Sequence, residues 1–234
     1  MISVIYEDEN LLALSKPAGV LVHPSSFSKE DKGQATVTDW LLKNYPEVKM
    51  VGDNPAERPG IVHRLDRETS GVLLVARNQK TFEYLKKLFQ EHKVVKTYLA
   101  LVWGRLSGSG IIDVPIGLKP GTVRRVVRGK ALKMVKEAVT EYRALKTFKK
   151  GDDEFTLVEL TPKTGRTHQL RVHMKSINHP VVGDVLYSPK KDPFNLSRQF
   201  LHAESIEFTK SDGSRLKLEA ELPNELKTVI DSLS

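Results

Sequence analysis

A charged turn held between two apolar runs constrains this chain more than any other feature of its sequence. The turn, HRLDRETS at residues 63–70, lies between Ile61-Val62 and the apolar run at residues 72–76. The second run is a short block of mostly branched residues, the pattern of a strand buried on both faces. Gly60 and Gly71 flank the turn, and glycine permits tight backbone there. The sequence therefore predicts a polar loop held at the edge of a buried strand.

The loop places one carboxylate, Asp66, among His63, Arg64 and Arg67. Neighbouring guanidinium groups favour the ionised carboxylate, and such a group in a cleft is a candidate nucleophile or base. A surface salt bridge explains the same residues equally well, because exposed Arg–Asp pairs are common and contribute little. The spacing alone leaves both interpretations open.

Composition narrows the class of protein. The 234 residues suffice for one large domain or two lobes around a substantial core. The chain has no cysteine, which excludes disulfides and thiol catalysis. No stretch approaches the roughly 20 apolar residues of a membrane span, and the first residues do not resemble a signal peptide. We expect a soluble, cytoplasmic protein with no membrane partner.

The net charge of +8 is concentrated in one segment. Residues 119–150 hold 11 Lys or Arg and 2 acidic residues, whereas the remaining chain holds 26 and 27. A local basic patch attracts a phosphate backbone through counterion release. A solvated hairpin with an uneven charge distribution is the alternative, so charge alone favours nucleic-acid binding only slightly. Arg124, Arg125 and Arg128 are the candidate contacts.

The remaining pattern mixes strands and helices. Helices are expected at 38–45, 79–92 and 167–177 and after Pro223, and strands at 3–6, 11–14, 72–76, 96–103, 111–116, 139–148, 155–160, near 206 and at 216–222. Strands and helices do not alternate regularly, which favours an α+β fold with a largely antiparallel sheet. We see no repeat or linker, so residues 1–234 are expected to form a single domain.

Two further residues are candidates for chemistry. Tyr98 lies on the predicted strand 96–103, where a phenol can stack on a base and assist proton transfer, although core packing is commoner. Arg171 lies between Leu170 and Val172 in the predicted helix 167–177, so it can point inward. A buried guanidinium requires a partner, for which Asp66 is the obvious candidate. The alternative is an ordinary surface arginine.

Several cofactor sites lack support. His168, His173 and His179 do not have the spacing of a His-Glu-x-x-His zinc site, and their neighbours are basic. The chain also has no P-loop, no Gly-x-Gly-x-x-Gly and no Gly-x-Ser-x-Gly motif. We therefore expect no metal and no nucleotide cofactor.

Together these segments resemble the RluA branch of the pseudouridine synthases. The turn HRLDRETSG at 63–71 resembles that family's catalytic motif, and KTYLA at 96–100 its Lys-x-Tyr-x-Ala segment. GRTHQLRVH at 165–173, HPVVGDVLY at 179–187 and KPAG at 16–19 resemble further family motifs. The resemblance covers residues 1 to about 205 in the correct order.

The resemblance implies the pseudouridine synthase fold, with a mixed, mainly antiparallel central sheet flanked by helices and an RNA cleft between two lobes. Many relatives carry an N-terminal RNA-binding domain of the S4 type. This chain begins at the first catalytic-domain strands, so we expect no S4 domain. RNA capture would then depend on the cleft and the basic segment.

The implied reaction isomerises uridine in RNA to pseudouridine without a cofactor, with ribosomal RNA the leading substrate and transfer RNA second. Asp66 would act as nucleophile at C1′ or as base at the ribose 2′ position. Arg171 would keep Asp66 ionised and aimed, and Tyr98 would stack on the base. The substrate contacts are assigned to His63, Arg64, Arg166, His168, Val182 and the three arginines of the basic segment.

Two other functions remain. A catalytically silent RNA-binding relative would share the basic segment but need not keep Asp66, Tyr98 and Arg171 together. A glycoside or nucleoside hydrolase usually needs a second acid, and only Glu68 is near Asp66 in the sequence. We expect a monomeric isomerase.

Overall fold

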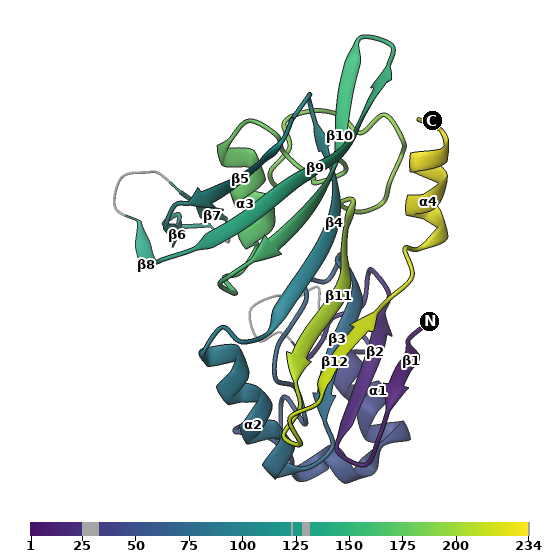
Figure 1. Cartoon of the computed structure of the whole chain (residues 1–234), viewed down its shortest axis with the longest axis vertical. Coiled ribbons are helices and arrows are strands. Elements are labelled where there is room, and N and C mark those ends of the chain that lie inside the picture. Colours follow the sequence, from purple (N-terminus) through teal and green to yellow (C-terminus); the bar gives the residue numbers. More distant parts are fainter. Residues whose placement is uncertain (25–32, 123, 128–131, 234) are drawn as a thin grey trace. The chain divides into compact units, whose positions relative to one another are not determined.

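A computed structural model describes residues 1–24, 33–122, 124–127 and 132–233. The chain forms two compact units (Figure 1). The first unit consists of Met1–Val94 and Ala203–Glu221, and the second of Val95–His202 and Leu222–Ser234. Each unit combines strands with helices, which confirms the predicted α+β class. No helix in the described ranges is long and apolar enough to cross a membrane.

The first unit contains a sheet with two helices. Its strands are β1 (Ser3–Glu7), β2 (Leu11–Lys16), β3 (Ser70–Ala76), most of β11 (Leu201–Thr209) and β12 (Arg215–Glu219). They follow the order β1-β2-β3-β11, with β12 beside β11. The pairs β1–β2, β2–β3 and β11–β12 are antiparallel. Every residue of β3 is buried, as its continuous apolar run predicts.

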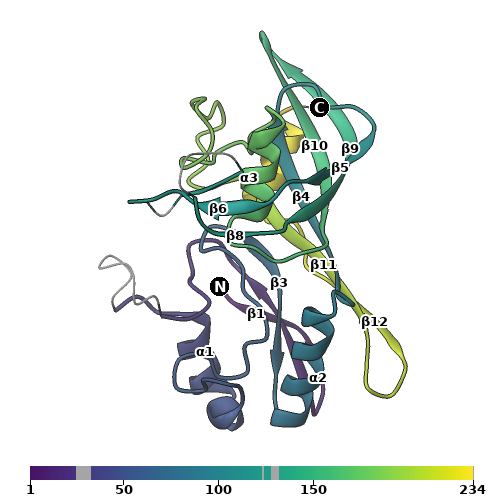
Figure 2. The same ribbon diagram turned by 90° about the vertical axis from the view of Figure 1, so that its left-hand side faces the viewer.

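The helices of the first unit begin at side-chain caps. In α1 (Val37–Asn44), Thr36 and Asp39 form a reciprocal capping box, and a short 3₁₀ helix (Pro46–Met50) follows. In α2 (Gln79–Gln90), Asn78 accepts a hydrogen bond from the backbone N–H of Thr81. The apolar face of α2 joins the core of this unit. Figure 2 shows α2 among the elements of the first unit. The helix predicted at 79–92 is confirmed, although it ends at Gln90.

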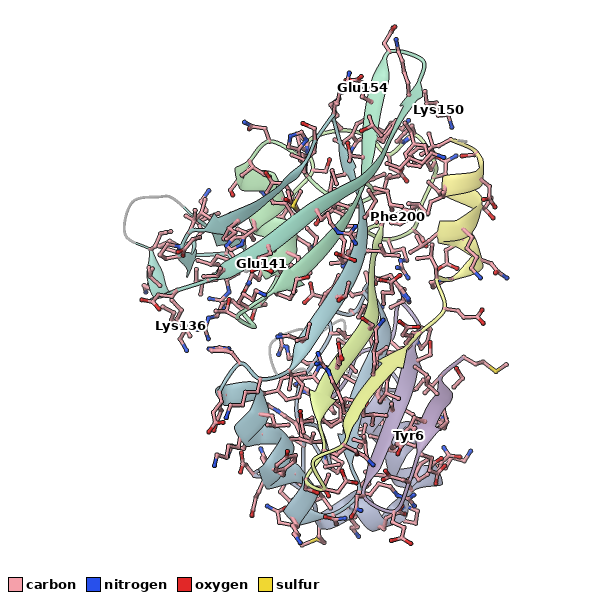
Figure 3. The ribbon with its side chains drawn as sticks, viewed as in Figure 1. Tyr6, Lys136, Glu141, Lys150, Glu154 and Phe200 are labelled. Atoms are coloured by element: carbon pink, nitrogen blue, oxygen red, sulfur yellow. The ribbon has the colours of Figure 1, made fainter. Side chains whose placement is uncertain are left out.

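The second unit is built on a four-stranded antiparallel sheet. Its order is β4 (Val95–Trp103), β10 (Asp153–Pro162), β9 (Val139–Lys150) and β5 (Ser109–Asp113). The β9–β10 hairpin extends to the labelled Lys150 and Glu154 in Figure 3. The helices α3 (Gln169–Ser176) and α4 (Asn224–Asp231) contribute Leu170, Met174, Leu226 and Val229 to the core of this unit.

A separate small sheet contains part of the basic segment. It has the order β7 (Arg125–Val126), β6 (Ile116–Leu118) and β8 (Lys133–Lys136), all antiparallel. The single strand predicted at 111–116 is therefore wrong in detail, because β5 ends at Asp113 and β6 begins at Ile116. Pro115 lies at the break, and proline cannot donate a hydrogen bond to a sheet.

Candidate active site

Two glycines fix the ends of the loop that carries Asp66. Gly60 has φ +70°, and a Cβ there would lie 2.6 Å from the carbonyl oxygen of Ala76. Gly71 has φ +121°, and a Cβ there would overlap the backbone of Ala203 on β11. Both positions therefore require glycine for conformation and for space. The loop is held against the edge of buried strand β3, as the sequence predicts.

His63 fastens this loop to β3 from within. Its Nε2 accepts a hydrogen bond from the backbone N–H of Leu74 at 2.9 Å, and its ring stacks on Phe89 with the centroids 4.8 Å apart. Because Nε2 accepts, the ring proton lies on Nδ1. The backbone N–H of Thr69 donates to the carbonyl of Asp66 at 3.1 Å. Asp66 itself is half-buried, whereas Arg64 is exposed.

A buried lysine also binds this loop. Lys16 is fully buried, and its Nζ donates to the carbonyl oxygens of Pro17, Val20 and Arg67 at 2.8, 2.8 and 2.9 Å. The backbone N–H of Gly19 donates to the same Arg67 carbonyl at 3.0 Å. The Lys-Pro-Ala-Gly turn is thus bound to the residue next to Asp66. The sequence indicated this turn only as a motif, with no specific contact for Lys16.

In the second unit, Arg171 is buried and paired with Asp184. Its Nε lies 2.6 Å from Oδ2 of Asp184, and its Nη2 lies 2.9 Å from Oδ1. The side chains are only 8% and 0% exposed. The backbone N–H groups of Leu186 and Tyr187 also donate to Oδ1, each at 3.0 Å. The predicted inward direction of Arg171 is confirmed, and Asp184 is a partner that the sequence analysis missed.

Tyr187 lies beside this pair. Its ring is buried, and the guanidinium carbon of Arg171 is 5.0 Å from the ring centroid. Its hydroxyl lies 2.8 Å from Nδ1 of His168 and accepts from the backbone N–H of Arg125 at 3.0 Å. The structure therefore brings together Arg171, His168 and the backbone of Arg125, three of the residues selected from the sequence.

Tyr98 lies on β4 opposite Leu160 of β10 and is half-buried against the core of the second unit. Lys96 is two residues earlier, and alternate residues of a strand share a face. Burial lowers the pKa of Lys96 to about 8. A lysine with a lowered pKa two residues before a candidate catalytic tyrosine is a functional indication that the sequence did not supply.

The other selected residues have diverse environments. Arg166 donates from Nε to the carbonyl of Glu137 at 2.9 Å. Val182 is fully buried in the core, where its backbone N–H donates to Leu101. Arg124 is exposed and Arg125 is half-buried, while Arg128 lies outside the described residues.

The histidines considered for a metal have partners in the protein. His173 is buried, with Nδ1 2.9 Å from Oγ1 of Thr140 and Nε2 3.0 Å from the carbonyl of Val114. Nδ1 of His179 lies 2.8 Å from the carbonyl of Trp103. Among the residues that the structure describes, no group of three or more His, Asp or Glu side chains could hold a metal ion.

Comparison with known proteins identifies the family. The model of the RNA pseudouridylate synthase family matches residues 10–176. The chain is 40% identical over 94% of its length to an uncharacterised RNA pseudouridine synthase of Chloroflexus aurantiacus, and 36% identical over 99% to ribosomal large subunit pseudouridine synthase D of Borreliella burgdorferi. It spans 65% of the first relative and 72% of the second.

A solved structure agrees with these relatives. The human RNA pseudouridylate synthase domain containing 1 is 25% identical, with a TM-score of 0.76 over 100% of this chain and 94% of that one. The loop around Asp66 and the segment around Arg171 both lie within the range that the family model matches. The chain therefore belongs to the RNA pseudouridylate synthase family.

Proposed function

We propose that this chain is an RNA pseudouridine synthase that isomerises uridine to pseudouridine, with Asp66 as the catalytic carboxylate. The observation that carries the proposal is the fixation of the Asp66 loop. The loop is confined at its ends by Gly60 and Gly71. It is also held by hydrogen bonds of His63 and Lys16 within the first unit. A carboxylate on such a loop is preorganised for attack or proton abstraction.

The reaction balances without a cofactor. The C1′–N1 bond of uridine breaks, the uracil turns while it is held, and a C5–C1′ bond forms. C5 then loses its proton and N1 gains one, so no electrons enter or leave. Asp66 acts at C1′ as nucleophile or at the 2′ position as base, and Tyr98 assists removal of the C5 proton.

Arg171 serves this reaction as an oriented donor. Its Nε and Nη2 are bound to Asp184, so the direction of the whole planar guanidinium is set. We propose that Arg171 keeps Asp66 ionised and aimed. The bound Asp184 explains how a buried guanidinium is retained in the second unit, since an unpaired buried charge is strongly unfavourable.

The small basic sheet is the proposed RNA contact. Arg124, Lys133 and Lys136 are exposed, and Arg125 lies on β7. Figure 3 labels Lys136 at the end of β8. These cations attract the phosphate backbone, and the target nucleotide flips into the site at a cost of a few kcal/mol. His63, Arg64, Arg166, His168 and Val182 complete the proposed substrate contacts, directly or by shaping the site, with Arg128 continuing the basic segment.

Ribosomal RNA is the proposed substrate, with transfer RNA second. The support is the similarity to relatives named ribosomal large subunit pseudouridine synthase D, from Borreliella burgdorferi and from Nitrosomonas europaea. We further propose that residues 1–234 act as one catalytic domain, as a monomer in the cytoplasm. Counterion release gives this binding a strong salt dependence.

Product analysis tests the proposal. Large-subunit ribosomal RNA and transfer RNA transcripts, tritiated at uridine C5, are incubated with the protein and then digested to nucleosides. We expect tritium release with an equal amount of pseudouridine, and more of both from ribosomal RNA. Free uracil would instead identify a hydrolase. RNA binding without either product would identify a silent RNA-binding protein.

A further inference from the structure

Tyr187 occupies an unusual place in the second unit. It is only 3% exposed, yet its hydroxyl has two polar contacts and its ring lies beside a buried cation. The hydroxyl lies 3.0 Å from the backbone nitrogen of Arg125 and 2.8 Å from Nδ1 of His168. One side chain therefore contacts β7, the residue preceding α3, and Arg171 within α3.

The hydroxyl fixes the position of the ring. The Arg125 N–H can only donate, so the phenol oxygen accepts that hydrogen bond. The phenol proton is then available for Nδ1 of His168 in its Nε2–H form. Two directional hydrogen bonds from different segments restrict rotation of the ring about its bonds to the backbone. A phenylalanine in the same place would pack but would lack both bonds.

The Tyr187 ring in turn restricts the orientation of the Arg171 guanidinium. Asp184 binds one edge of Arg171 through Nε and Nη2. The Tyr187 ring lies 5.0 Å from the guanidinium carbon, within the range of a cation–π contact. Asp184 and Tyr187 are linked to each other, because the backbone N–H of Tyr187 donates to Asp184 Oδ1 at 3.0 Å. The two side chains therefore hold Arg171 as a unit.

We propose that Tyr187 is a positioning residue for Arg171, and that its hydroxyl transmits the position of β7 and His168 to the guanidinium. This inference rests on the proposed function, in which Arg171 aims Asp66. Tyr187 does not touch the reacting atoms in this account. Loss of the hydroxyl therefore impairs turnover more than RNA affinity.

The variant Tyr187→Phe tests this role because it keeps the ring and removes only the hydroxyl. Its matched control is Tyr142→Phe, a half-buried tyrosine on β9 whose hydroxyl lies against Gly110. Tritium release is measured against RNA concentration for each protein. We expect kcat to fall at least fivefold in Tyr187→Phe with a smaller change in KM. In the control, both kcat and KM should stay within twofold. Wild-type kcat in Tyr187→Phe, or a loss confined to KM, would overturn the proposal.

A double-variant comparison separates positioning from general damage. If Tyr187 acts through Arg171, Tyr187→Phe changes kcat less than twofold when Arg171→Lys is already present. Equal effects in both backgrounds would show that Tyr187 acts by another route. Thermal unfolding is measured for both variants, and the kcat values are compared at a temperature at which both proteins are fully folded, so that the kcat difference is not a folding defect.

A second readout does not depend on activity. The ¹⁵N–¹H signal of the Arg171 Nε–H is assigned by its loss in Arg171→Lys, and its exchange with water is followed by NMR. We expect exchange to accelerate at least fivefold in Tyr187→Phe and less than twofold in Tyr142→Phe. Unchanged exchange in Tyr187→Phe would overturn the positioning role. If the wild-type protein releases no tritium, the proposed function fails while this measurement still decides the role of Tyr187.

Discussion

Arg171 is bound to Asp184 at two points, through Nε–Oδ2 at 2.6 Å and Nη2–Oδ1 at 2.9 Å. The positive charge that the proposed mechanism uses is therefore already paired within its own unit. A two-point pair fixes the plane of the guanidinium, so Arg171 serves as a directed hydrogen-bond donor more than as an uncompensated charge.

Asp184→Ala should destabilise the second unit strongly. It removes the Asp184 carboxylate from the buried Arg171 guanidinium, and breaking a buried pair from one side costs about 3–5 kcal/mol. Urea denaturation measures the loss. The control is Asp153→Ala, which removes an exposed pair with Lys190 and should cost less than about 1 kcal/mol. Equal losses in the two variants would contradict the importance of the buried pair.

Gly71→Ala should prevent close approach of β3 and β11. The added Cβ would overlap the backbone of Ala203 at a residue with φ +121°, so we expect a loss of about 3 kcal/mol or more in unfolding free energy. Gly213→Ala is the control, because φ there is +85° but no atom lies within 4 Å of the added Cβ. Backbone strain alone should lower the unfolding free energy of that control by about 1 kcal/mol. A smaller effect at Gly71 than at Gly213 would refute the packing argument.

Lys16→Met should loosen the loop that carries Asp66 and slow the reaction. The carbonyls of Pro17, Val20 and Arg67 would lose a buried donor, and each unsatisfied buried acceptor costs about 1–3 kcal/mol. We expect lower unfolding free energy and at least tenfold slower tritium release. Lys86→Met, which removes only an exposed pair with Asp53, should behave as wild type. Normal turnover in Lys16→Met would show that the loop keeps its geometry without the ammonium.

Stability should decrease on mild acidification because of His173. Burial lowers the pKa of His173 below its usual 6.5, so the unfolded chain takes up this proton at a higher pH than the folded chain. The stabilisation is complete above about pH 6.5 and is lost progressively below it. Urea unfolding at pH 7.5 and 5.5 measures the decline, which should be smaller in His173→Gln. Burial also lowers the pKa of His23, so part of the decline should remain. An unchanged decline in the variant would exclude His173 as a source.

Features of the fold that depend on residues close together in the sequence could be predicted. The buried strand β3 follows from one apolar run, and the edges of the Asp66 loop follow from Gly60 and Gly71. The return of residues 203–221 to the first unit was not predictable, because β11 and β12 find their partners through contacts distant in sequence. Pro115 indicated the interrupted strand in retrospect.

The sequence selected candidate site residues but did not predict their partners. The family motifs selected Asp66, Tyr98 and Arg171, yet the contact of Arg171 with Asp184 depends on how the segment after α3 folds back. Lys16 carried no sequence signal for burial, because a lysine is normally solvated unless carbonyls surround it. Sequence spacing alone does not predict that Arg171 contacts Asp184 or that Lys16 contacts backbone carbonyls.

We propose that Asp66 performs the isomerisation, and the variant Asp66→Asn provides the decisive test. Asparagine keeps the size of the side chain and removes its charge and nucleophilicity. Tritium release from C5-labelled ribosomal RNA is measured for wild type, Asp66→Asn and the neighbouring control Glu68→Gln, with RNA binding measured in parallel. We expect no release from Asp66→Asn, near-normal release from Glu68→Gln and retained RNA binding in both. Near-wild-type release from Asp66→Asn would exclude Asp66 as the catalytic carboxylate.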